Sequence, residues 1–372
     1  MNGTRETLGV YIHIPFCVKK CGYCDFYSVP AQIKAVSDYI EALTADIRAS
    51  HFGGRVVDTV YFGGGTPTLI GADALSTALD ALRGAAAVDD NAEITFEANP
   101  ATIDQSGLMT LRRAGFNRLS LGAQSADDDE LRVLGRIHAF SNVKETVIAA
   151  KQAGFSNISL DLMYGLPDQT VRGFLGSIEA VLALKPTHLS CYCLKLEEGT
   201  PMYSRSSSLT LPDEDVLFEM YDKAAETLET AGFEHYEISN FALNGFRSRH
   251  NMKYWNCEEY LGFGPSAHSY INGRRFAVSP DLEGYTAGRK NIGQTEDIDP
   301  AEQLKEYLML RLRLSDGIDK DEFERRFEVS FAPYASLLSR LKDRVIIENG
   351  RYRLNRAGFF VSNSIIGELL NI

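Results

Sequence analysis

The fold is decided most clearly by residues 11–24, which read Tyr11-Ile12-His13-Ile14-Pro15-Phe16-Cys17-Val18-Lys19-Lys20-Cys21-Gly22-Tyr23-Cys24. An apolar run is followed at once by three cysteines in C-x3-C-x2-C spacing. Three thiolates are one short of the four that a cubane iron–sulfur cluster takes. A cluster bound this way leaves one iron open to an exchangeable ligand, as a catalytic zinc keeps one open position.

Two other uses of these cysteines are zinc binding and a disulfide framework. Zinc needs a fourth Cys or His nearby, and His13 is a weak candidate because it lies inside the expected strand. Disulfides are untypical of a long chain with six cysteines and no visible signal peptide. The spacing therefore favours a [4Fe-4S] cluster on Cys17, Cys21 and Cys24.

The composition is that of a globular protein with a large domain and a smaller one. The chain has 372 residues, 44% of them hydrophobic and 24% charged. Its net charge of −12 argues against broad nucleic-acid binding, so no nucleic-acid partner is expected. No stretch reaches the roughly 18–20 apolar residues of a membrane span. Residues 1–8 show no export signal, and with reduced thiols this predicts a cytoplasmic protein.

A weak repeat indicates serial β/α units. An Ala-Gly-Phe sequence followed by a strand-like run occurs at 114–121, at 153–160 and, more loosely, at 231–238. Each copy is typical of a helix end, a glycine cap and a strand. Repeating units of about 40 residues with this order build a parallel sheet or barrel.

Six strands are predicted before residue 200, with amphipathic helices between them. The strands are expected at 9–14, 58–62, 93–97, 118–121, 158–161 and 188–192. Examples of the expected helices lie at 36–50, 75–82, 130–134 and 143–153. Polar or glycine-rich features follow the strands in the same order: the three cysteines, residues 63–68, Glu97, Gln124, Asp161 and Lys195. Because the carboxyl ends of barrel strands share one rim, these features are expected together on it.

The cysteine stretch resembles the motif of radical S-adenosylmethionine (SAM) enzymes. Its flanking Tyr-x-His-Ile-Pro-Phe-Cys is similar to that of the group containing the oxygen-independent coproporphyrinogen III oxidases. The resemblance implies an α/β fold, with a partial (β/α)6 radical SAM barrel in residues 1–240. It also implies that the open iron binds the amino and carboxylate groups of SAM, and that one electron from the cluster cleaves SAM to a 5′-deoxyadenosyl radical.

By the same resemblance, ten residues match positions that contact SAM. They are Tyr11, Tyr23, Gly64, Gly65, Thr66, Glu97, Gln124, Arg136, Asp161 and Lys195. Glu97 is expected to accept from the methionine ammonium, Arg136 to hold the carboxylate by a bidentate bond, and Asp161 to accept from a ribose hydroxyl. The glycine run at 63–65 by itself indicates equally a tight turn or a close approach of backbone to a ligand.

A second decisive segment is His250-Asn251-Met252-Lys253-Tyr254-Trp255, which holds the only tryptophan. An imidazole beside large aromatic rings can ligate haem iron while the rings pack on the porphyrin, but a turn with an aromatic core anchor is the commoner structure. The His-Asn-x-x-Tyr-Trp pattern resembles that of the HemW-type haem chaperones, and this resemblance covers almost the whole chain. It implies haem binding by His250, with Tyr254 and Trp255 packing on the haem.

The C-terminal part is expected to be a separate α+β domain. Helix patterns at 304–312, 319–327 and 334–342 precede a hairpin at 345–354 with an Asn349-Gly350 turn. This order suggests a winged-helix-like domain in residues 299–372, after a connecting segment at 241–298 that carries the haem-binding motif. The 12 basic and 11 acidic residues between positions 301 and 372 nearly cancel, which favours a lid or partner-docking role over DNA binding.

Three functions compete: a haem chaperone, a coproporphyrinogen III oxidase, and another radical SAM enzyme such as a methyltransferase. The oxidase pattern continues with a fourth cysteine where this chain has Phe26, and it has a long N-terminal extension, whereas the first strand here is expected by Gly9. No methyltransferase element is visible, and Cys191, Cys193 and Cys257 are expected to be buried thiols. The chaperone is therefore favoured, without oxidase activity and with no catalytic residue assigned. SAM cleavage and a homodimer stay open, and the resemblance implies an electron donor and a respiratory, membrane-associated haem acceptor.

Overall fold

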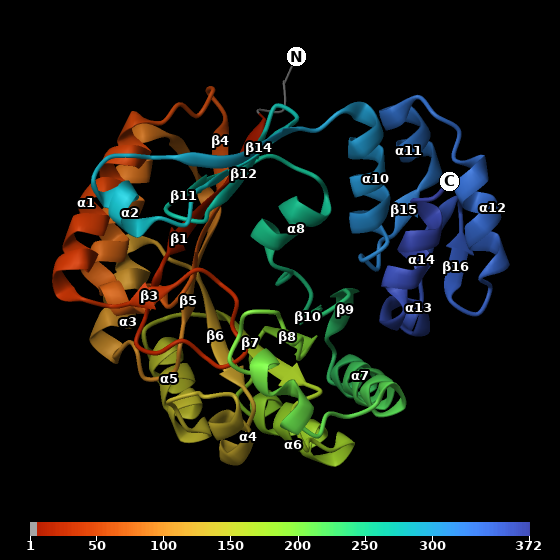
Figure 1. The fold of residues 1–372 in the computed structure, drawn as a ribbon, viewed down its shortest axis with the longest axis horizontal. Helices are drawn as coiled ribbons and strands as arrows, with labels where there is room; N and C mark the ends of the chain where they lie inside the picture. The colour runs from red at the N-terminus through yellow and green to blue at the C-terminus, as the bar shows by residue number, and fades with distance from the viewer. Residues whose placement is uncertain (1–5) are drawn as a thin grey trace.

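The computed structural model describes residues 6–372, so most of the segment expected to lack an export signal lies outside the described residues. A large curved sheet forms the main body, and a small C-terminal domain lies at its open side (Figure 1). The sheet has the strand order β14-β13-β12-β11-β1-β4-β5-β6-β7-β8-β10-β9. Between residues 6 and 372, no helix combines the length and the apolar character that crossing a bilayer requires.

Six parallel strands form the centre of the sheet, and they confirm the six predicted strands. They are β1 (Thr7–Ile14), β4 (Val56–Gly64), β5 (Ala87–Ala98), β6 (Arg118–Gln124), β7 (Asn157–Tyr164) and β8 (His188–Cys193). Most of them run longer than predicted. β5 differs most, because residues 89–91 are polar and exposed and so escape a search for buried apolar runs.

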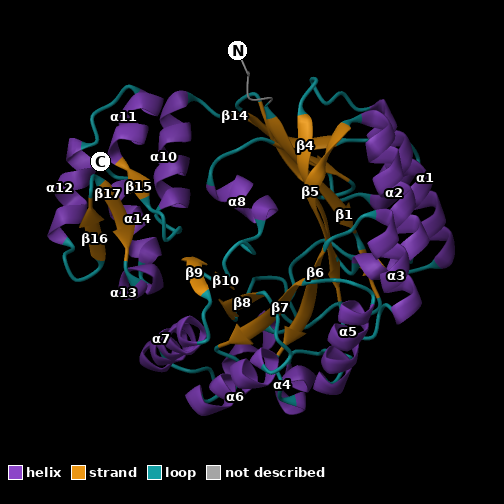
Figure 2. Ribbon diagram, turned by 180° about the vertical axis from the view of Figure 1, so that it is seen from behind, coloured by secondary structure: helices purple, strands orange, loops and turns teal. Residues whose placement is uncertain are grey.

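Helices cover the convex outer face of these strands (Figure 2). They are α1 (Ile33–Ala49), α2 (Ala72–Ala85), α3 (Gln105–Ala114), α4 (Asp128–Val133), α5 (Phe140–Gln152), α6 (Val171–Leu182) and α7 (Glu214–Thr230), with short 3₁₀ turns at Pro67–Ile70 and Tyr203–Ser208. Side chains alternate across a strand, so one face of each strand meets the helices. On β4 and β6 the apolar Val60, Phe62 and Leu119 belong to the core, while Thr59, Tyr61 and Arg118 occupy the alternate positions.

The sheet is not closed into a full barrel. On one side β8 pairs with β10 (Asn240–Ala242), which pairs with β9 (Glu234–Glu237), both antiparallel. On the other side β1 pairs in parallel with β11 (Tyr260–Phe263), and antiparallel strands β12 (His268–Ile271), β13 (Arg274–Val278) and β14 (Ile292–Asp297) continue the sheet, with α9 (Leu282–Thr286) between the last two. The expected connecting segment thus extends the main sheet.

One helix of this segment occupies the opening. α8 (Arg249–Trp255) carries the His-Asn-x-x-Tyr-Trp sequence and packs against β4 on one side and α10 (Pro300–Arg311) on the other. Both views place it between the curved sheet and the C-terminal domain (Figures 1 and 2). The motif therefore lies where the incomplete barrel would otherwise be open.

The C-terminal domain has the expected helices followed by a hairpin. After α10 come β15 (Ile318–Asp319), α11 (Lys320–Phe327), α12 (Ala332–Arg340), β16 (Val345–Glu348), β17 (Arg351–Leu354), α13 (Arg356–Phe360) and α14 (Ser362–Leu369). The three strands pair in the order β15-β17-β16. Asn349 and Gly350 both have positive φ in the hairpin turn, as the two central residues of a type I′ turn require. The short strand β2 (Phe16–Cys17) pairs with β3 (Val29–Pro30) elsewhere, next to the cysteines.

Candidate functional site

The three motif cysteines lie at the mouth of a cavity of about 460 Å³ at the carboxyl ends of the parallel strands. Cys17 ends β2, while Cys21 and Cys24 lie in the loop that follows, and all three thiols are free and half-buried. Two backbone hydrogen bonds hold that loop, from Gly22 N to Leu134 O at 3.2 Å and from Met202 N to Gly22 O at 2.8 Å. The loop thus presents its sulfur atoms to one space.

The three cysteines supply the thiolate ligands that a cubane cluster takes. Among residues 6–372, no three His, Cys, Asp or Glu side chains are gathered tightly enough to hold one metal ion. A cubane takes one thiolate at each of several separate irons, so its ligands stand further apart. Arg136 Nη1 lies 3.4 Å from Cys21 Sγ, so its guanidinium contacts the cysteine loop directly. Cys193, at the end of β8, lines the same cavity, although burial raises the pKa of its thiol to about 11.

Nine of the ten residues proposed to contact SAM line this cavity. They are Tyr23, Gly64, Gly65, Thr66, Glu97, Gln124, Arg136, Asp161 and Lys195. Tyr11 does not: its hydroxyl bonds His13 Nδ1 at 3.0 Å and its ring stacks on Tyr61. The expected common rim therefore brings together residues from β4 to β8, from the loops after these strands and from the loop after β2.

Glu97 is the buried carboxylate at the end of β5. It accepts from the Tyr61 hydroxyl at 2.8 Å and from Gly64 N at 3.2 Å. Burial raises its pKa to about 7, with Asp161 as a further cause in the same direction. A cationic amino group in the cavity would favour the ionised form of Glu97, as the proposed SAM contact requires.

The glycine run at 63–65 is required by the protein's own packing. Gly64 has φ +110°, and a Cβ there would lie 2.6 Å from the His13 ring. A Cβ on Gly65 would lie 2.5 Å from Phe16 O. The glycines let the end of β4 approach β1 and β2, which positions the backbone beside the cysteine loop.

Arg136 links the cysteine loop to the strands. Besides Cys21, it donates to Asn99 Oδ1 and to Gly122 O, the latter at 2.9 Å. Gln124 ends β6 with a φ of +66°, a conformation that costs a non-glycine residue about 1 kcal/mol or more and that concentrates at functional sites. Its side chain accepts from the Tyr192 hydroxyl at 2.8 Å. These contacts fix both side chains at the cavity wall.

Asp161 and Lys195 differ in their surroundings. Asp161 lies inside the cavity, where burial raises the pKa of its carboxyl and hydrogen bonds from Ser190 and Ser120 oppose that shift. Lys195 is 80% exposed at the cavity edge, and its ammonium pairs with Glu197 at 2.5 Å. Only the backbone or the aliphatic stem of Lys195 is placed to contact a ligand within the cavity.

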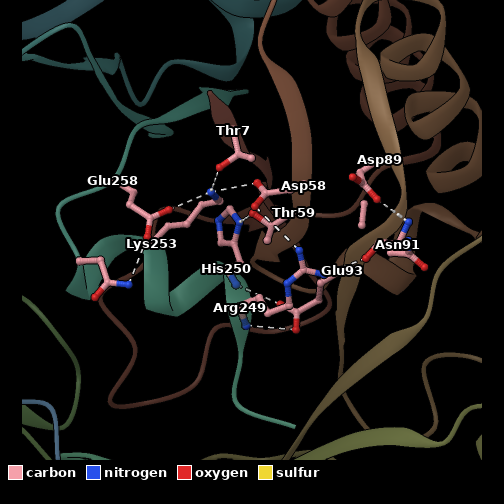
Figure 3. Close-up of polar contacts among 12 residues, drawn as sticks. Thr7, Asp58, Thr59, Asp89, Asn91, Glu93, Arg249, His250, Lys253 and Glu258 are labelled. Carbon is pink, nitrogen blue, oxygen red and sulfur yellow. Dashed lines mark hydrogen bonds and ion pairs between the residues drawn. The ribbon is translucent and has the colours of Figure 1, made fainter. Parts of the chain in front are cut away.

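The start of α8 is fixed by a carboxylate from β5. Glu93 accepts from Arg249 N at 3.1 Å and from His250 N at 3.0 Å, and a negative charge at a helix N-terminus is favourable (Figure 3). Further along α8, the buried Lys253 ammonium pairs with Asp58 at 2.9 Å and with Glu258 at 3.0 Å (Figure 3). These bonds anchor the helix against β4 and β5.

His250 is fully buried beneath α8, and both of its ring nitrogens have protein partners. Nδ1 lies 2.9 Å from Thr59 Oγ1 and Nε2 lies 2.8 Å from the Tyr254 hydroxyl. The ring stacks on Tyr61 at a centroid distance of 5.3 Å. Burial lowers the pKa of His250 to about 3, so the ring is neutral. In this conformation neither nitrogen is free for iron, while Tyr254 and Trp255 are half-buried.

Several cavity residues escaped the sequence reasoning. Among them are Tyr61, Asn99, Arg118, His188, Ser190, Asn240 and Asn251. On β4, β6 and β8 the signal was a polar side chain at every second position, such as Arg118 and Ser120, which marks a polar inner face. Asn251 belongs to the motif of α8, so that motif and the proposed SAM site meet in one cavity.

Comparison with known proteins places the chain in a defined group. It matches the family model of the Radical SAM superfamily over residues 11–181 and that of the HemN C-terminal domain over residues 298–361. It is 37% identical over 324 residues to the Heme chaperone HemW of Escherichia coli (strain K12), covering 85% of each chain. It is 36% identical over 372 residues to the Heme chaperone HemW of Bacillus subtilis (strain 168), covering 97% of this chain and 98% of that protein.

A solved structure shares the fold over nearly the whole length. The structure described as coproporphyrinogen III oxidase (HemN) from Escherichia coli, a radical SAM enzyme, superposes with a TM-score of 0.85. The match covers 98% of this chain and 90% of that one at 23% sequence identity. At that identity the likeness shows a common fold, including the curved sheet and the C-terminal domain.

Proposed function

Because this chain belongs to the HemW family of radical SAM proteins, we propose that it is a haem chaperone, which binds haem and transfers it to an acceptor protein. The observation that carries the proposal is the identity of a third or more to HemW proteins over most of the chain. The structure adds a cavity in which the cysteine loop, the proposed SAM contacts and Asn251 of the α8 motif meet.

We propose that Cys17, Cys21 and Cys24 hold one [4Fe-4S] cluster and that SAM lies beside it. When bound, the cluster supplies an electron to SAM. In this proposal Glu97 accepts from the SAM ammonium and Arg136 pairs with its carboxylate, which is supported by the place of both side chains in the cavity wall. The role of the cluster in haem transfer is tested by Cys21→Ala: haem transfer that stays normal without the cluster would exclude an obligatory role for it.

Haem ligation by His250 requires a local rearrangement. The ring is 0% exposed, and Nε2 would have to exchange the Tyr254 hydroxyl for iron. Thr59 can keep its bond to Nδ1 during this exchange, and a ligating histidine commonly has such a partner on its other nitrogen. Tyr254 and Trp255 follow His250 on the same short helix, which suits rings that pack on the porphyrin face of a haem bound there.

The other partners belong to the same proposal. They are an electron donor for the cluster, a respiratory haem-acceptor protein at the membrane, and a second copy of the chain in a homodimer. We place the protein in the cytoplasm. The half-buried thiols of the cysteine loop lie near the surface, within reach of a docked electron donor.

The test is an anaerobic haem titration by absorbance after cluster reconstitution. Wild type is compared with His250→Ala and with His268→Ala, a matched control that removes an exposed histidine on β12. Stoichiometric binding that weakens only in His250→Ala supports the proposal. The same samples are assayed with coproporphyrinogen III, and conversion to protoporphyrinogen IX would identify the protein as the oxidase instead.

A further inference from the structure

The inner end of the cavity is lined by polar residues outside the set proposed to bind SAM. They are Arg118, Ser120, His188, Ser190, Asn240 and Asn251, from β6, β8, β10 and α8. The cavity of about 460 Å³ lies within the size range of sites that hold one drug-sized molecule. Arg118 and His188 are the first residues of β6 and β8, whereas the cysteines lie at the carboxyl ends of the strands, so this inner end lies away from the cysteine loop.

Arg118 is the dominant group at this inner end. It is only 2% exposed, yet its Nε and Nη1 atoms have no hydrogen-bond partner among residues 6–372. Thr95 on β5 is the register partner of Arg118. Its buried hydroxyl and the buried amide oxygen of Asn240 likewise have no hydrogen-bond partner among the described residues. Burying an unpaired guanidinium is costly, so a side chain kept in this state is one that a ligand can complete.

The nearby carboxylates are used by other groups. Both Glu97 oxygens accept bonds, from Tyr61 and from Gly64 N, and neither bonds Arg118. Asp161 accepts from Ser120 at 3.5 Å and from Ser190. In ligand-free protein, burial raises the pKa of both carboxyl groups, that of Glu97 to about 7.

His188 completes the surroundings without adding charge. Its Nδ1 lies 2.7 Å from Ser159 Oγ and its Nε2 lies 2.8 Å from the Tyr236 hydroxyl. Burial lowers the pKa of His188, so the ring is neutral. Among residues 6–372, the Arg118 guanidinium at the inner end of the cavity therefore has no hydrogen-bonded counter-ion.

We propose that Arg118 forms a carboxylate-binding subsite for the second ligand that shares the cavity with SAM. A planar guanidinium presents paired N–H donors that match a carboxylate. The identity of the carrier rests on the proposed function: haem bears two propionates, and a propionate can enter the inner end while the macrocycle stays outside at α8. Asn251 lines the cavity directly after His250, which connects the subsite to the haem motif.

The test compares haem with haem dimethyl ester, in which both carboxylates are blocked. Reconstituted wild type with SAM is expected to bind haem at least about tenfold more tightly than the ester, as for a lost charge-assisted bond. Arg118→Gln should bind the two equally, and Arg118→Lys should restore part of the preference. Preference retained in Arg118→Gln, or absent in wild type that still binds haem, overturns the subsite and leaves the chaperone function standing.

Two further measurements separate folding and function from the subsite. Removing an unpaired buried cation should leave the melting temperature of ligand-free Arg118→Gln unchanged or higher, whereas a fall of several degrees would show a structural role and overturn the inference. If wild type binds neither haem nor its ester, the proposed function fails. Glutarate then tests the subsite alone: stabilisation of SAM-loaded wild type but not of Arg118→Gln supports it, and no effect on wild type overturns it.

Discussion

The exchange proposed at His250 makes an unusual prediction for Tyr254→Phe. This change keeps the aromatic ring, whose centroid lies 4.6 Å from that of Tyr260. It removes only the hydroxyl, which lies 2.8 Å from His250 Nε2. If Nε2 must leave that hydroxyl to bind iron, the variant should bind haem more tightly than wild type. Loss of an aromatic contact would instead weaken binding.

The magnitude follows from one buried hydrogen bond. Such a bond contributes about 1 kcal/mol net, which corresponds to about fivefold in affinity. The same loss should lower the free energy of unfolding of the haem-free protein by about 1 kcal/mol. Tyr254→Phe is therefore expected to be less stable in urea and yet about fivefold tighter in an anaerobic haem titration.

Thr59→Val provides the matched control at the other ring nitrogen. It removes the partner of Nδ1, 2.9 Å away, and leaves Nε2 bonded to Tyr254. It should also destabilise the protein, but without any gain in haem affinity. Weaker or unchanged haem binding in Tyr254→Phe, or an equal gain in Thr59→Val, would show that the Tyr254 hydroxyl does not compete with iron for Nε2.

Three further predictions follow from the cavity and the buried histidine. Because the pKa of Glu97 is raised to about 7, SAM affinity measured by calorimetry should rise several-fold from pH 6 to pH 8, and Glu97→Gln should flatten that profile. Cys21→Ala should lose bound iron and the visible absorbance of the cluster after reconstitution, whereas Cys257→Ala, outside the motif, should keep both. The pKa of His250 is lowered from 6.5 to about 3, so its contribution to stability is present above pH 6.5 and is lost as the pH falls towards 3. That loss amounts to about 3 kcal/mol at pH 4.5, and urea unfolding should show His250→Gln to be less sensitive to acid than wild type.

The central strands were predictable because the apolar residues of each outer face lie within a few consecutive positions of the sequence. Each strand carries alternating or continuous apolar residues that the helices cover. A short window of sequence is enough to show this apolar pattern. The strands β11 to β14 were not expected, since each is short and is stabilised by pairing with a neighbouring strand. β11 in particular joins β1, about 250 positions earlier in the chain.

The haem motif shows the limit of a local pattern. The sequence places an imidazole close to two aromatic residues, a pattern that suits haem binding. The pattern is the same whether the imidazole is exposed to solvent or buried. The structure buries His250 between Thr59, Tyr61 and Tyr254, and two of these contacts come from β4. Burial of this kind depends on where α8 packs against the sheet, and the seven residues of the helix do not by themselves predict that position.

The cluster of three thiols could be read from the chain alone, because eight consecutive residues stay together in any fold. The β/α order could be read in the same way, since that order is written in local apolar periodicity. The packed fold is needed to bring Glu97, Arg136 and Asp161 to the cysteines in one cavity, and to bury Arg118 with two nitrogens that have no hydrogen-bond partner within residues 6–372. Partners and burial depend on residues far apart in the chain, so they exist only after the strands have paired.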